Sequence, residues 1–475
     1  MAEEIEWREL DNSAKIFPIS AGKKYSTVFR YSAVLKKEID AKILVKAVDK
    51  SLDKFKYFRM RLRKGMFWHY LEYNENPAIV VKEAEYPCEY VNPKECNEYL
   101  FRISYYKNKI SVDYYHVLTD GNSALEIFKE ILYQYIELKN PKKFQKETRD
   151  KDFLKYELKA SDDFLKNYDK NVKSNINSEI SYEVKGERLP IEKIATIHEY
   201  IDSNELKTVA KKYNSTITQY LSAVLIYAIY NSNMDKNKID SNPIKLCIPV
   251  NLRRYFESKT ISNFFSYFTV VAHIKDDRLD NFEKILDLVK KEFETKLTKE
   301  EIIKTMSANV KIGTNRFIKI IPIHLKMLLV RIGYFIIRKY TTMTFSNVGR
   351  FGVLKDYQDY IDHVLFMIAP EPIEKIKTSA ISYNNITALS FTTNIVNTEI
   401  EYEVKRILES HGLKIGMESN HVVNVKNENK MNLLETPYPE KIDKKKYFVR
   451  LEKRVELYKR KRENFREKFR KRFKM

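Results

Sequence analysis

The sequence is poor in the residues that build several common kinds of site. Its 475 residues include 3 cysteines, 10 glycines and 2 tryptophans. The cysteines, Cys88, Cys96 and Cys247, are odd in number and have neither Cys-x-x-Cys nor histidine-paired zinc spacing. We therefore expect no disulfide scaffold and no metal site, and a reducing cytoplasm is the predicted compartment.

Other common signals are also missing. We find no internal repeat and no glycine-rich phosphate loop. The N-terminus, MAEEIEWREL, is acidic and lacks an apolar core, so a cleaved secretory signal is not expected. The most apolar run, 318–337, contains a proline, a histidine and three basic residues. This run predicts a buried or amphipathic helix rather than a membrane span.

Charge is the one compositional outlier. The net charge is +21, and residues 441–475 hold 17 Lys or Arg against 5 Asp or Glu, which places more than half of the excess in one tail. Apolar residues recur there at helical spacing, at Phe448, Leu451, Val455, Tyr458, Phe465, Phe469 and Phe473. This pattern predicts a basic amphipathic helix that binds an anionic membrane surface. A solvated charged helix is the alternative, and nucleic acid is not expected because its binding needs no apolar stripe.

One histidine lies at a predicted strand-to-helix junction. In the strand 109–115 and the residue after it, the alternating positions Ile110, Val112, Tyr114 and His116 share one face. Thr119-Asp120-Gly121-Asn122 then supplies turn and N-cap residues before a helical pattern. His116 therefore ends an apolar row just before a helix starts.

Two interpretations of His116 are open. An imidazole held in one orientation at such a junction suits a general base, because it titrates near neutrality. A lone histidine at the end of an apolar row is more often a hydrogen-bonded core residue. Asp120 also has two potential roles, since it could orient His116 or pair with an arginine and brace the turn.

The sequence around this histidine resembles a known family. His116-Val117-Leu118-Thr119-Asp120-Gly121 is similar to the His-x-x-x-Asp-Gly motif of the chloramphenicol acetyltransferase-like superfamily, which includes condensation domains and bacterial alcohol acetyltransferases. Three later stretches fall in the superfamily's order. They are 202–221, 249–265 with Asn251-Leu252-Arg253-Arg254, and Thr344-Phe345-Ser346-Asn347-Val348-Gly349. The resemblance covers most of 10–435 and is strongest to the bacterial alcohol acetyltransferase-like proteins.

The resemblance implies a fold and a division of the chain. The expected fold is α/β (α+β, two-layer), with two chloramphenicol acetyltransferase-like subdomains that contain mixed sheets and an active-site channel between them. We assign 1–138 to an N-terminal subdomain, 139–190 to a crossover linker, 191–440 to a C-terminal subdomain and 441–475 to the basic tail. The linker is a natural position for a lid.

The resemblance also implies roles for individual residues. His116 is the expected catalytic base, while Asp120, Gly121 and Arg253 are expected to shape the site, with Arg253 pairing with Asp120. Candidates for lining the channel or for donating to an oxyanion are Tyr115, Asn263, Ser346 and Asn347. Asn263 could equally be an ordinary core residue, and isolated strand hydroxyls are mostly structural. Many relatives carry a His-His pair where this chain has Tyr115-His116, and the second histidine is the catalytic one in those families. The signature Asp-Phe-Gly-Trp-Gly of the plant branch is absent.

The predicted function is acyl transfer, most simply acetyl transfer, from a coenzyme A thioester to an alcohol or amine. No bound cofactor is expected, and acyl-coenzyme A is the co-substrate. A carrier-protein-dependent condensation enzyme and a non-catalytic membrane or protein adaptor are the alternatives. A cytoplasmic monomer, attached peripherally to a membrane through 441–475, completes the prediction.

Overall fold

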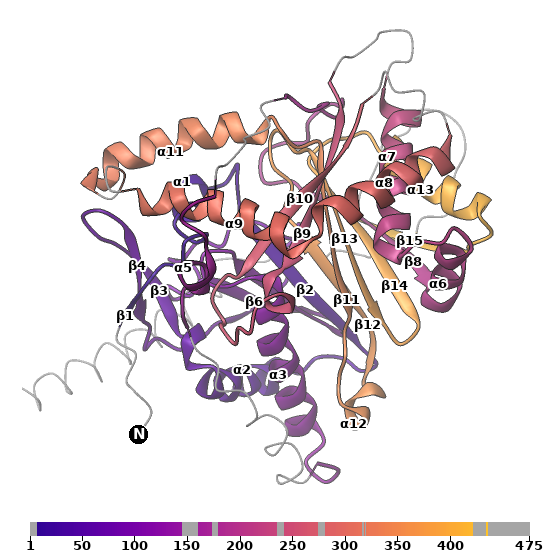
Figure 1. The fold of residues 1–475 in the computed structure, drawn as a ribbon. Coiled ribbons are helices and arrows are strands. Elements are labelled where there is room, and N and C mark those ends of the chain that lie inside the picture. The colour runs from indigo at the N-terminus through magenta and orange to yellow at the C-terminus, as the bar shows by residue number, and fades with distance from the viewer. Residues whose placement is uncertain are drawn as a thin grey trace, which may run out of the picture. The chain divides into compact units, whose positions relative to one another are not determined.

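The computed structural model describes residues 7–144, 160–172, 179–234, 242–273, 281–315, 318, 320–420 and 434–435. The chain divides into two units, residues 1–435 and 436–475. The second unit, which contains the whole basic tail, lies outside the described residues, as do parts of the predicted linker. The described part of the first unit contains three β-sheets, with helices packed against the two larger ones (Figure 1).

His116 follows a strand of a five-stranded sheet. In the order β12-β2-β7-β6-β5, its strands are β12 (Ile361–Ile368), β2 (Val28–Leu35), β7 (Lys109–Tyr115), β6 (Phe101–Tyr106) and β5 (Val80–Lys82). The pairs β2–β7 and β6–β7 are antiparallel. Strands β6 and β7 form a hairpin, in which Tyr106 pairs with Lys109 across a two-residue turn. Lys107 in this turn has a φ of 48°, as a tight hairpin requires.

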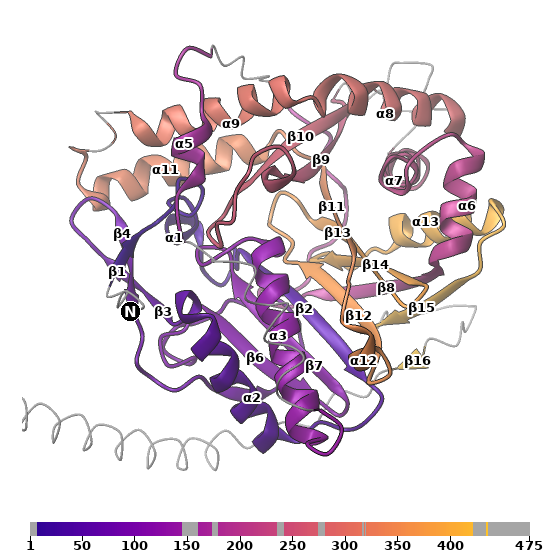
Figure 2. The same ribbon diagram turned by 60° about the horizontal axis from the view of Figure 1, so that its bottom comes forward.

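Two amphipathic helices, α2 (Ala41–Lys54) and α3 (Gly121–Lys139), pack against each other over this sheet (Figure 2). Asp40 caps the first by accepting hydrogen bonds from the backbone N–H groups of Lys42 and Ile43, and Asp120 caps the second through Ser123. Such caps satisfy N–H groups that have no partner inside the helix. The start of α3 is therefore fixed five residues after His116.

The second large sheet has eight strands. In the order β10-β9-β11-β13-β14-β8-β15-β16, they are β10 (Phe265–Ala272), β9 (Ile244–Asn251), β11 (Met343–Arg350), β13 (Ile376–Tyr383), β14 (Ile386–Thr393), β8 (Ala195–Asp202), β15 (Ile415–Ser419) and β16 (Leu434–Glu435). Strand β11 is parallel to β9 and β13, whereas β14 is antiparallel to β8 and β13. Both large sheets contain a parallel and an antiparallel pair, as expected of mixed sheets.

The helices of the second half include one that is buried on almost every side. They are α6 (Ser203–Lys212), α7 (Ile217–Asn233), α8 (Phe282–Lys296), α9 (Lys299–Thr314), α11 (Ile323–Arg338), α12 (Lys355–Gln358) and α13 (Glu399–Ser410), with the shorter α5 (Asp163–Asn167) in the linker. The central helix is α7, which packs against α8 and α13 as its nearly uniform apolar sequence indicates. Its first turn carries a capping box made by Thr216 and Gln219.

Strand β12 joins the two large sheets. It belongs to the second half of the chain, yet it pairs with β2 at the edge of the five-stranded sheet. It also packs on the eight-stranded sheet, where Thr392 Oγ1 donates to the Ile368 carbonyl. The division of the chain into subdomains at 138 and 191 stays a prediction. Strand β12 belongs to the predicted C-terminal subdomain but pairs with β2 of the predicted N-terminal subdomain.

A small sheet and two helices complete the N-terminal side. The sheet has the order β1-β4-β3 and consists of β1 (Trp7–Glu9), β4 (His69–Tyr73) and β3 (Met60–Lys64), while α1 (Phe17–Ser20) packs on α11. Among the described helices, none has both the length and the apolar character needed to cross a membrane. Helix α11, which covers most of the apolar run, carries apolar residues on its buried and on its exposed side: Ile323 is buried, whereas Leu328 is exposed.

Candidate active site

His116 lies directly after β7, partly buried among aromatic rings. Its backbone N–H donates to the Thr27 carbonyl at 3.1 Å, which continues the pairing of β7 with β2. The Phe17 ring stacks on the imidazole with ring centroids 4.6 Å apart. Phe29 and Phe265 approach it to 5.1 and 5.2 Å. These rings come from α1, β2 and β10, so the imidazole is held between the two large sheets and α1.

The side-chain amide of Asn263, in the loop before β10, contacts the imidazole. Asn263 Oδ1 lies 2.9 Å from His116 Nδ1, and Asn263 Nδ2 donates to the His116 carbonyl at 3.2 Å. Asn263 is fully buried. The same amide therefore fixes both the ring and the backbone of His116, and the sequence had left open whether Asn263 was a plain core residue.

Asp11 holds this amide in turn. Its Oδ2 accepts hydrogen bonds from Asn263 N and Nδ2, at 3.1 and 2.9 Å, while its Oδ1 accepts from Ala14 N at 2.8 Å. Burial raises the pKa of Asp11 to about 6, although the hydrogen bonds from Asn263 oppose the rise. Above that pH Asp11 is a carboxylate that can only accept hydrogen bonds.

The chain Asp11–Asn263–His116 has a defined direction. Asn263 Nδ2 faces two acceptors, the Asp11 carboxylate and the His116 carbonyl, so it must be the amide NH₂ group. Asn263 Oδ1 then faces His116 Nδ1, which has to donate. In the neutral ring the proton is accordingly on Nδ1, and Nε2 carries the lone pair.

Asp120 does not share this chain, because its hydrogen bonds go elsewhere. Its Oδ1 accepts from Ser123 N at 3.1 Å, and its Oδ2 accepts from Arg253 Nη1 and Phe264 N, both at 2.8 Å. The pairing expected between Asp120 and Arg253 is thus present. Of the two roles left open for Asp120, the contacts correspond to bracing the turn.

Arg253 connects the start of α3 to the loop that carries Asn263. Its Nη2 donates to the carbonyls of Thr260 and Ser262, both at 2.8 Å, and to Ser123 Oγ at 2.9 Å. Several donors of one planar guanidinium are thus engaged, an arrangement that lysine cannot copy. Arg253 therefore positions the backbone from Thr260 to Ser262, directly before Asn263.

Gly121 lies where α3 passes close to β2. Tyr31 Oη donates to the Gly121 carbonyl at 3.0 Å, and a Cβ at position 121 would lie 3.3 Å from Tyr31 Oη. Such a contact is tighter than ordinary packing allows. Glycine at this position thus permits Tyr31 to fasten the start of α3.

Burial, rather than the surrounding charges, favours the neutral form of His116. Burial lowers the pKa of His116, and Lys377 lowers it further, while Asp120 and Asn263 act in the opposite direction. Lys377 lies on β13, is itself buried, and pairs with Glu371 at 2.9 Å and Glu374 at 3.3 Å. Within the described residues, no three His, Cys, Asp or Glu side chains group to hold a metal ion.

The other predicted residues lie in different settings. Tyr115 faces away from His116 along β7 and is buried in the N-terminal core, where burial raises the pKa of its hydroxyl. Ser346 is partly exposed on β11, opposite Ser379 of β13. Asn347 Nδ2 donates to Thr218 Oγ1 at 3.0 Å, at the start of α7. The channel and oxyanion roles of these three residues stay predictions.

Sequence reasoning did not find Asp11, Phe17 or Lys377. Asp11 stands in Asp11-Asn12-Ser13, which is typical of an exposed turn, and nothing in the pattern connects it with a loop 252 residues later. Phe17 belongs to an apolar N-terminal segment with no period. Lys377 is a single lysine in a strand, and its only signal is the spacing of three from Glu374.

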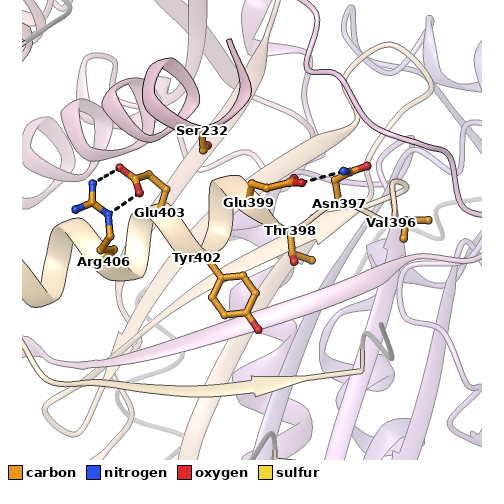
Figure 3. A pocket seen from close by; sticks show the side chains of 8 residues that line it. All are labelled: Ser232, Val396, Asn397, Thr398, Glu399, Tyr402, Glu403 and Arg406. Carbon is orange, nitrogen blue, oxygen red and sulfur yellow. Dashed lines mark hydrogen bonds and ion pairs between the residues drawn. The ribbon is translucent and has the colours of Figure 1, made fainter. Parts of the chain in front are cut away.

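A surface hollow elsewhere shares none of these residues. It has a volume of about 570 Å³ and is lined by Ser232, Val396, Asn397, Thr398, Glu399, Tyr402, Glu403 and Arg406 (Figure 3). Arg406 pairs there with Glu403 at 2.6 Å. The Arg406 side chain is 67% exposed, which is typical of a solvated surface ion pair.

Solved structures of acyltransferases share this fold. TRI3 trichothecene 15-O-acetyltransferase from Fusarium sporotrichioides superposes with a TM-score of 0.57 at 8% identity, over 86% of this chain and 96% of that one. TRI101 from F. graminearum, solved with coenzyme A and T-2 mycotoxin, gives 0.57 at 10% identity, over 86% and 99%. The starter condensation domain of rhizomide synthetase RzmA, solved with C8-CoA, gives 0.56 at 12% identity, over 86% and 94%.

Sequence comparison identifies the family. A search of curated proteins found no match. The family model described as alcohol acetyltransferase, however, matches residues 101–397, which include His116, Arg253, Asn263 and Lys377. This match spans more than half of the chain. The chain therefore belongs to the alcohol acetyltransferase family and is an acyltransferase.

Proposed function

We propose that the protein transfers an acetyl group from a coenzyme A thioester to an alcohol, with His116 as the general base. The observation that carries this proposal is the orientation of Asn263, whose Oδ1 accepts the proton of His116 Nδ1 at 2.9 Å. Nε2 is then the basic nitrogen of a ring with a lowered pKa. A general base needs this combination of a fixed tautomer and a neutral ring at the working pH.

The reaction is balanced with the residues at hand. Nε2 of His116 takes the proton of the acceptor hydroxyl while the oxygen attacks the thioester carbonyl. When the carbon–sulfur bond breaks, the imidazolium returns that proton to the departing thiolate. The thioester is already activated, so no covalent acyl-enzyme is needed, and general-base help contributes roughly 10²–10⁴-fold.

Asp11, Asn263 and Arg253 have positioning roles in this proposal. The Asp11 carboxylate orients the Asn263 amide, and the amide supports the imidazolium that forms during proton transfer. Arg253 holds the loop directly before Asn263, through the carbonyls of Thr260 and Ser262. Ser346 and Asn347 stay the candidates for donating to the thioester oxyanion, because they match the family's late strand.

Two further observations bear on the substrates. The family match names alcohols as acceptors, and titles of structures with the same fold name coenzyme A, C8-CoA and T-2 mycotoxin as bound molecules. Acyl-coenzyme A and a small alcohol are thus the proposed substrate pair. A carrier-protein thioester is the alternative donor, and the condensation-domain likeness is the observation that favours it.

The setting of the enzyme in the cell is also a proposal. The low cysteine content supports a cytoplasmic protein, and we propose that it is a monomer. The basic tail, 441–475, lies outside the described residues, and its sequence supports binding to an anionic membrane surface.

A substrate screen tests the proposal. The full chain is incubated with acetyl-coenzyme A and longer acyl-coenzyme A donors, each against a panel of alcohols and amines, and the products are detected by mass. Ester formation with release of free coenzyme A is the expected result. A second screen uses an acyl group bound to a carrier protein as the donor. Transfer from this donor alone would support the condensation-type alternative, and no transfer from coenzyme A or carrier-protein thioesters would support a non-catalytic adaptor.

A further inference from the structure

Helix α11 carries an apolar stripe that faces solvent. Leu325, Leu328, Leu329 and Ile332 follow the spacing i, i+3, i+4 and i+7, and their exposed fractions are 53%, 57%, 49% and 53%. One face of a helix with this spacing would normally be buried against a core. The outer position of α11 is visible in both ribbon views (Figures 1 and 2).

The tip of the β3–β4 hairpin extends this stripe. Met66 is 71% exposed and Phe67 is 38% exposed. The tip is fastened to α11, because Ile323 N donates to the Met66 carbonyl and Lys326 Nζ donates to the Phe67 carbonyl, both at 3.0 Å. The Lys326 ammonium also lies 3.6 Å from the centre of the Trp68 ring. We call the four α11 residues together with Met66 and Phe67 the α11 surface.

The charge of this region has one sign. Residues 302–342, which contain α11 and most of α9, include 8 Lys or Arg and no Asp or Glu. Arg331 and Lys64 are exposed on α11 and at the end of β3, and Lys64 Nζ lies 3.4 Å from His324 Nδ1. A second copy of this surface, or the basic tail, would be repelled electrostatically. An anionic partner is complementary.

We propose that the α11 surface docks on an anionic phospholipid bilayer. Leucine, isoleucine, methionine and phenylalanine side chains that protrude from a helix and a hairpin tip, with basic residues beside them, suit insertion at the boundary between headgroups and acyl chains. An exposed apolar row of this kind marks an interaction surface rather than ordinary solvated surface. Docking there uses residues that are distinct from the basic tail.

The docked face lies on the side of the molecule near the candidate active site. Arg331 Nε donates to the Ile19 carbonyl of α1 at 3.0 Å, and Phe17 of the same helix stacks on His116. Helix α1 is thus in contact with both α11 and the imidazole. A bilayer bound to the α11 surface would therefore be separated from the imidazole by the short helix α1.

Vesicle binding by the full chain tests the proposal. The test variant carries Leu328→Glu with Leu329→Glu. Its binding to vesicles of phosphatidylglycerol and phosphatidylcholine is measured by co-sedimentation and compared with that of the unaltered chain. The matched control is Leu165→Glu with Ile191→Glu, because these residues are also exposed, at 44% and 62%, and the net charge changes equally. The affinity of the α11 variant for the vesicles is expected to fall by about tenfold or more, while the control binds like the unaltered chain.

Two more variants separate the causes. Leu328→Ser with Leu329→Ser removes apolar area without adding charge and should still weaken binding, and Met66→Glu with Phe67→Glu should weaken it independently of the helix. Thermal unfolding shows whether each variant is folded. Binding by the α11 variants equal to that of the control would overturn the proposal, as would failure of the unaltered chain to bind anionic vesicles. An oligomer that the α11 variants dissociate, with vesicle binding unchanged, would assign the surface to a second copy instead.

Discussion

Asn263 Oδ1 lies 2.9 Å from His116 Nδ1, while the NH₂ group of the same amide lies 2.9 Å from the Asp11 carboxylate. Because a carboxylate only accepts, it decides which end of the amide faces the imidazole. The amide in turn decides which imidazole nitrogen carries the proton. A buried acid that does not touch His116 thus sets its tautomer through one intervening side chain.

Asp11→Asn tests this chain with an almost unchanged side-chain shape. Either orientation of the new amide points an NH₂ group at a donor, at Asn263 Nδ2 or at Ala14 N. A flip of the Asn263 amide would relieve the conflict at Nδ2, although Oδ1 would then face the His116 carbonyl. The flipped amide would require His116 Nδ1 to accept, so that the proton moves to Nε2. We expect kcat to fall roughly 10²-fold or more with little change in KM, because the base loses its lone pair.

The readout for Asp11→Asn is the nitrogen NMR spectrum of His116 together with steady-state kinetics. The tautomer signal should invert along with the fall in kcat. Asp287→Asn is the control, since Asp287 is 75% exposed on α8. A fall in kcat with an unchanged tautomer would show that Asp11 supports the fold and not the orientation of the ring.

His116→Ala removes the proposed base itself. Turnover should fall by roughly 10²–10⁴-fold, because proton transfer then depends on water. The exposed His273 on the C-terminal side of β10 provides a matched control, and His273→Ala should leave turnover unchanged. Initial rates of coenzyme A release measure both, and a full rate in folded His116→Ala would exclude His116 as the base.

The pH dependence of kcat/KM follows from the lowered pKa of His116. Burial is the main cause, and it disfavours the protonated ring. A base works when deprotonated, so activity should be level near pH 7 and fall only as the pH drops through a midpoint below the ordinary value of about 6.5. Rates measured from pH 5 to pH 8 check this. A midpoint above 6.5 would contradict the electrostatic description of the site.

The sequence predicted those parts of the fold whose pattern is local. The hairpin of β6 and β7 and the helices α3, α6 and α7 follow from turn residues, caps and apolar spacing within each segment. Strand β12 was not predicted. Its partner β2 lies far earlier in the chain, and the position of a strand at a sheet edge depends on that partner rather than on its own period. Local sequence patterns do not identify a strand partner that lies far away in the chain.

The same distinction applies to the site. His116, Asp120 and Arg253 belong to motifs that resemble the family, so their positions were predicted before their contacts were known. Asp11 and Lys377 are both buried, where water screens a charge less than at the surface. Burial of a single polar residue depends on the tertiary structure and leaves no period in the sequence.

Arg253→Ala should destabilise the protein by more than the loss of one hydrogen bond. It leaves the buried Asp120 carboxylate without its ion-pair partner and releases the carbonyls of Thr260 and Ser262. Breaking such a pair costs about 3–5 kcal/mol. Denaturant unfolding measures this cost, with Arg254→Ala as the control, because Arg254 is the exposed neighbour and should cost less than about 0.5 kcal/mol. Equal effects of the two substitutions would contradict a bracing role.

A last prediction concerns two buried carboxyl groups, Glu199 of β8 and Glu401 of α13, whose side-chain oxygens have no hydrogen-bond partner among the described residues. Burial raises the pKa of Glu401 from 4.5 to about 8, and burial together with Glu401 raises that of Glu199. The folded state therefore holds a proton that the unfolded chain releases, so stability should decrease as the pH rises from 4.5 to 8.

Glu401→Gln removes this titration and keeps the side-chain shape. The variant should match the unaltered chain near pH 5 and become more stable toward pH 8, by roughly 4 kcal/mol if the whole shift is expressed. Unfolding midpoints across that range give the measurement. Glu399→Gln, at an exposed position in the same helix, should show no such trend. A difference between Glu401→Gln and the unaltered chain that stays constant with pH would mean that Glu401 is ionised in the folded protein and that another group neutralises it.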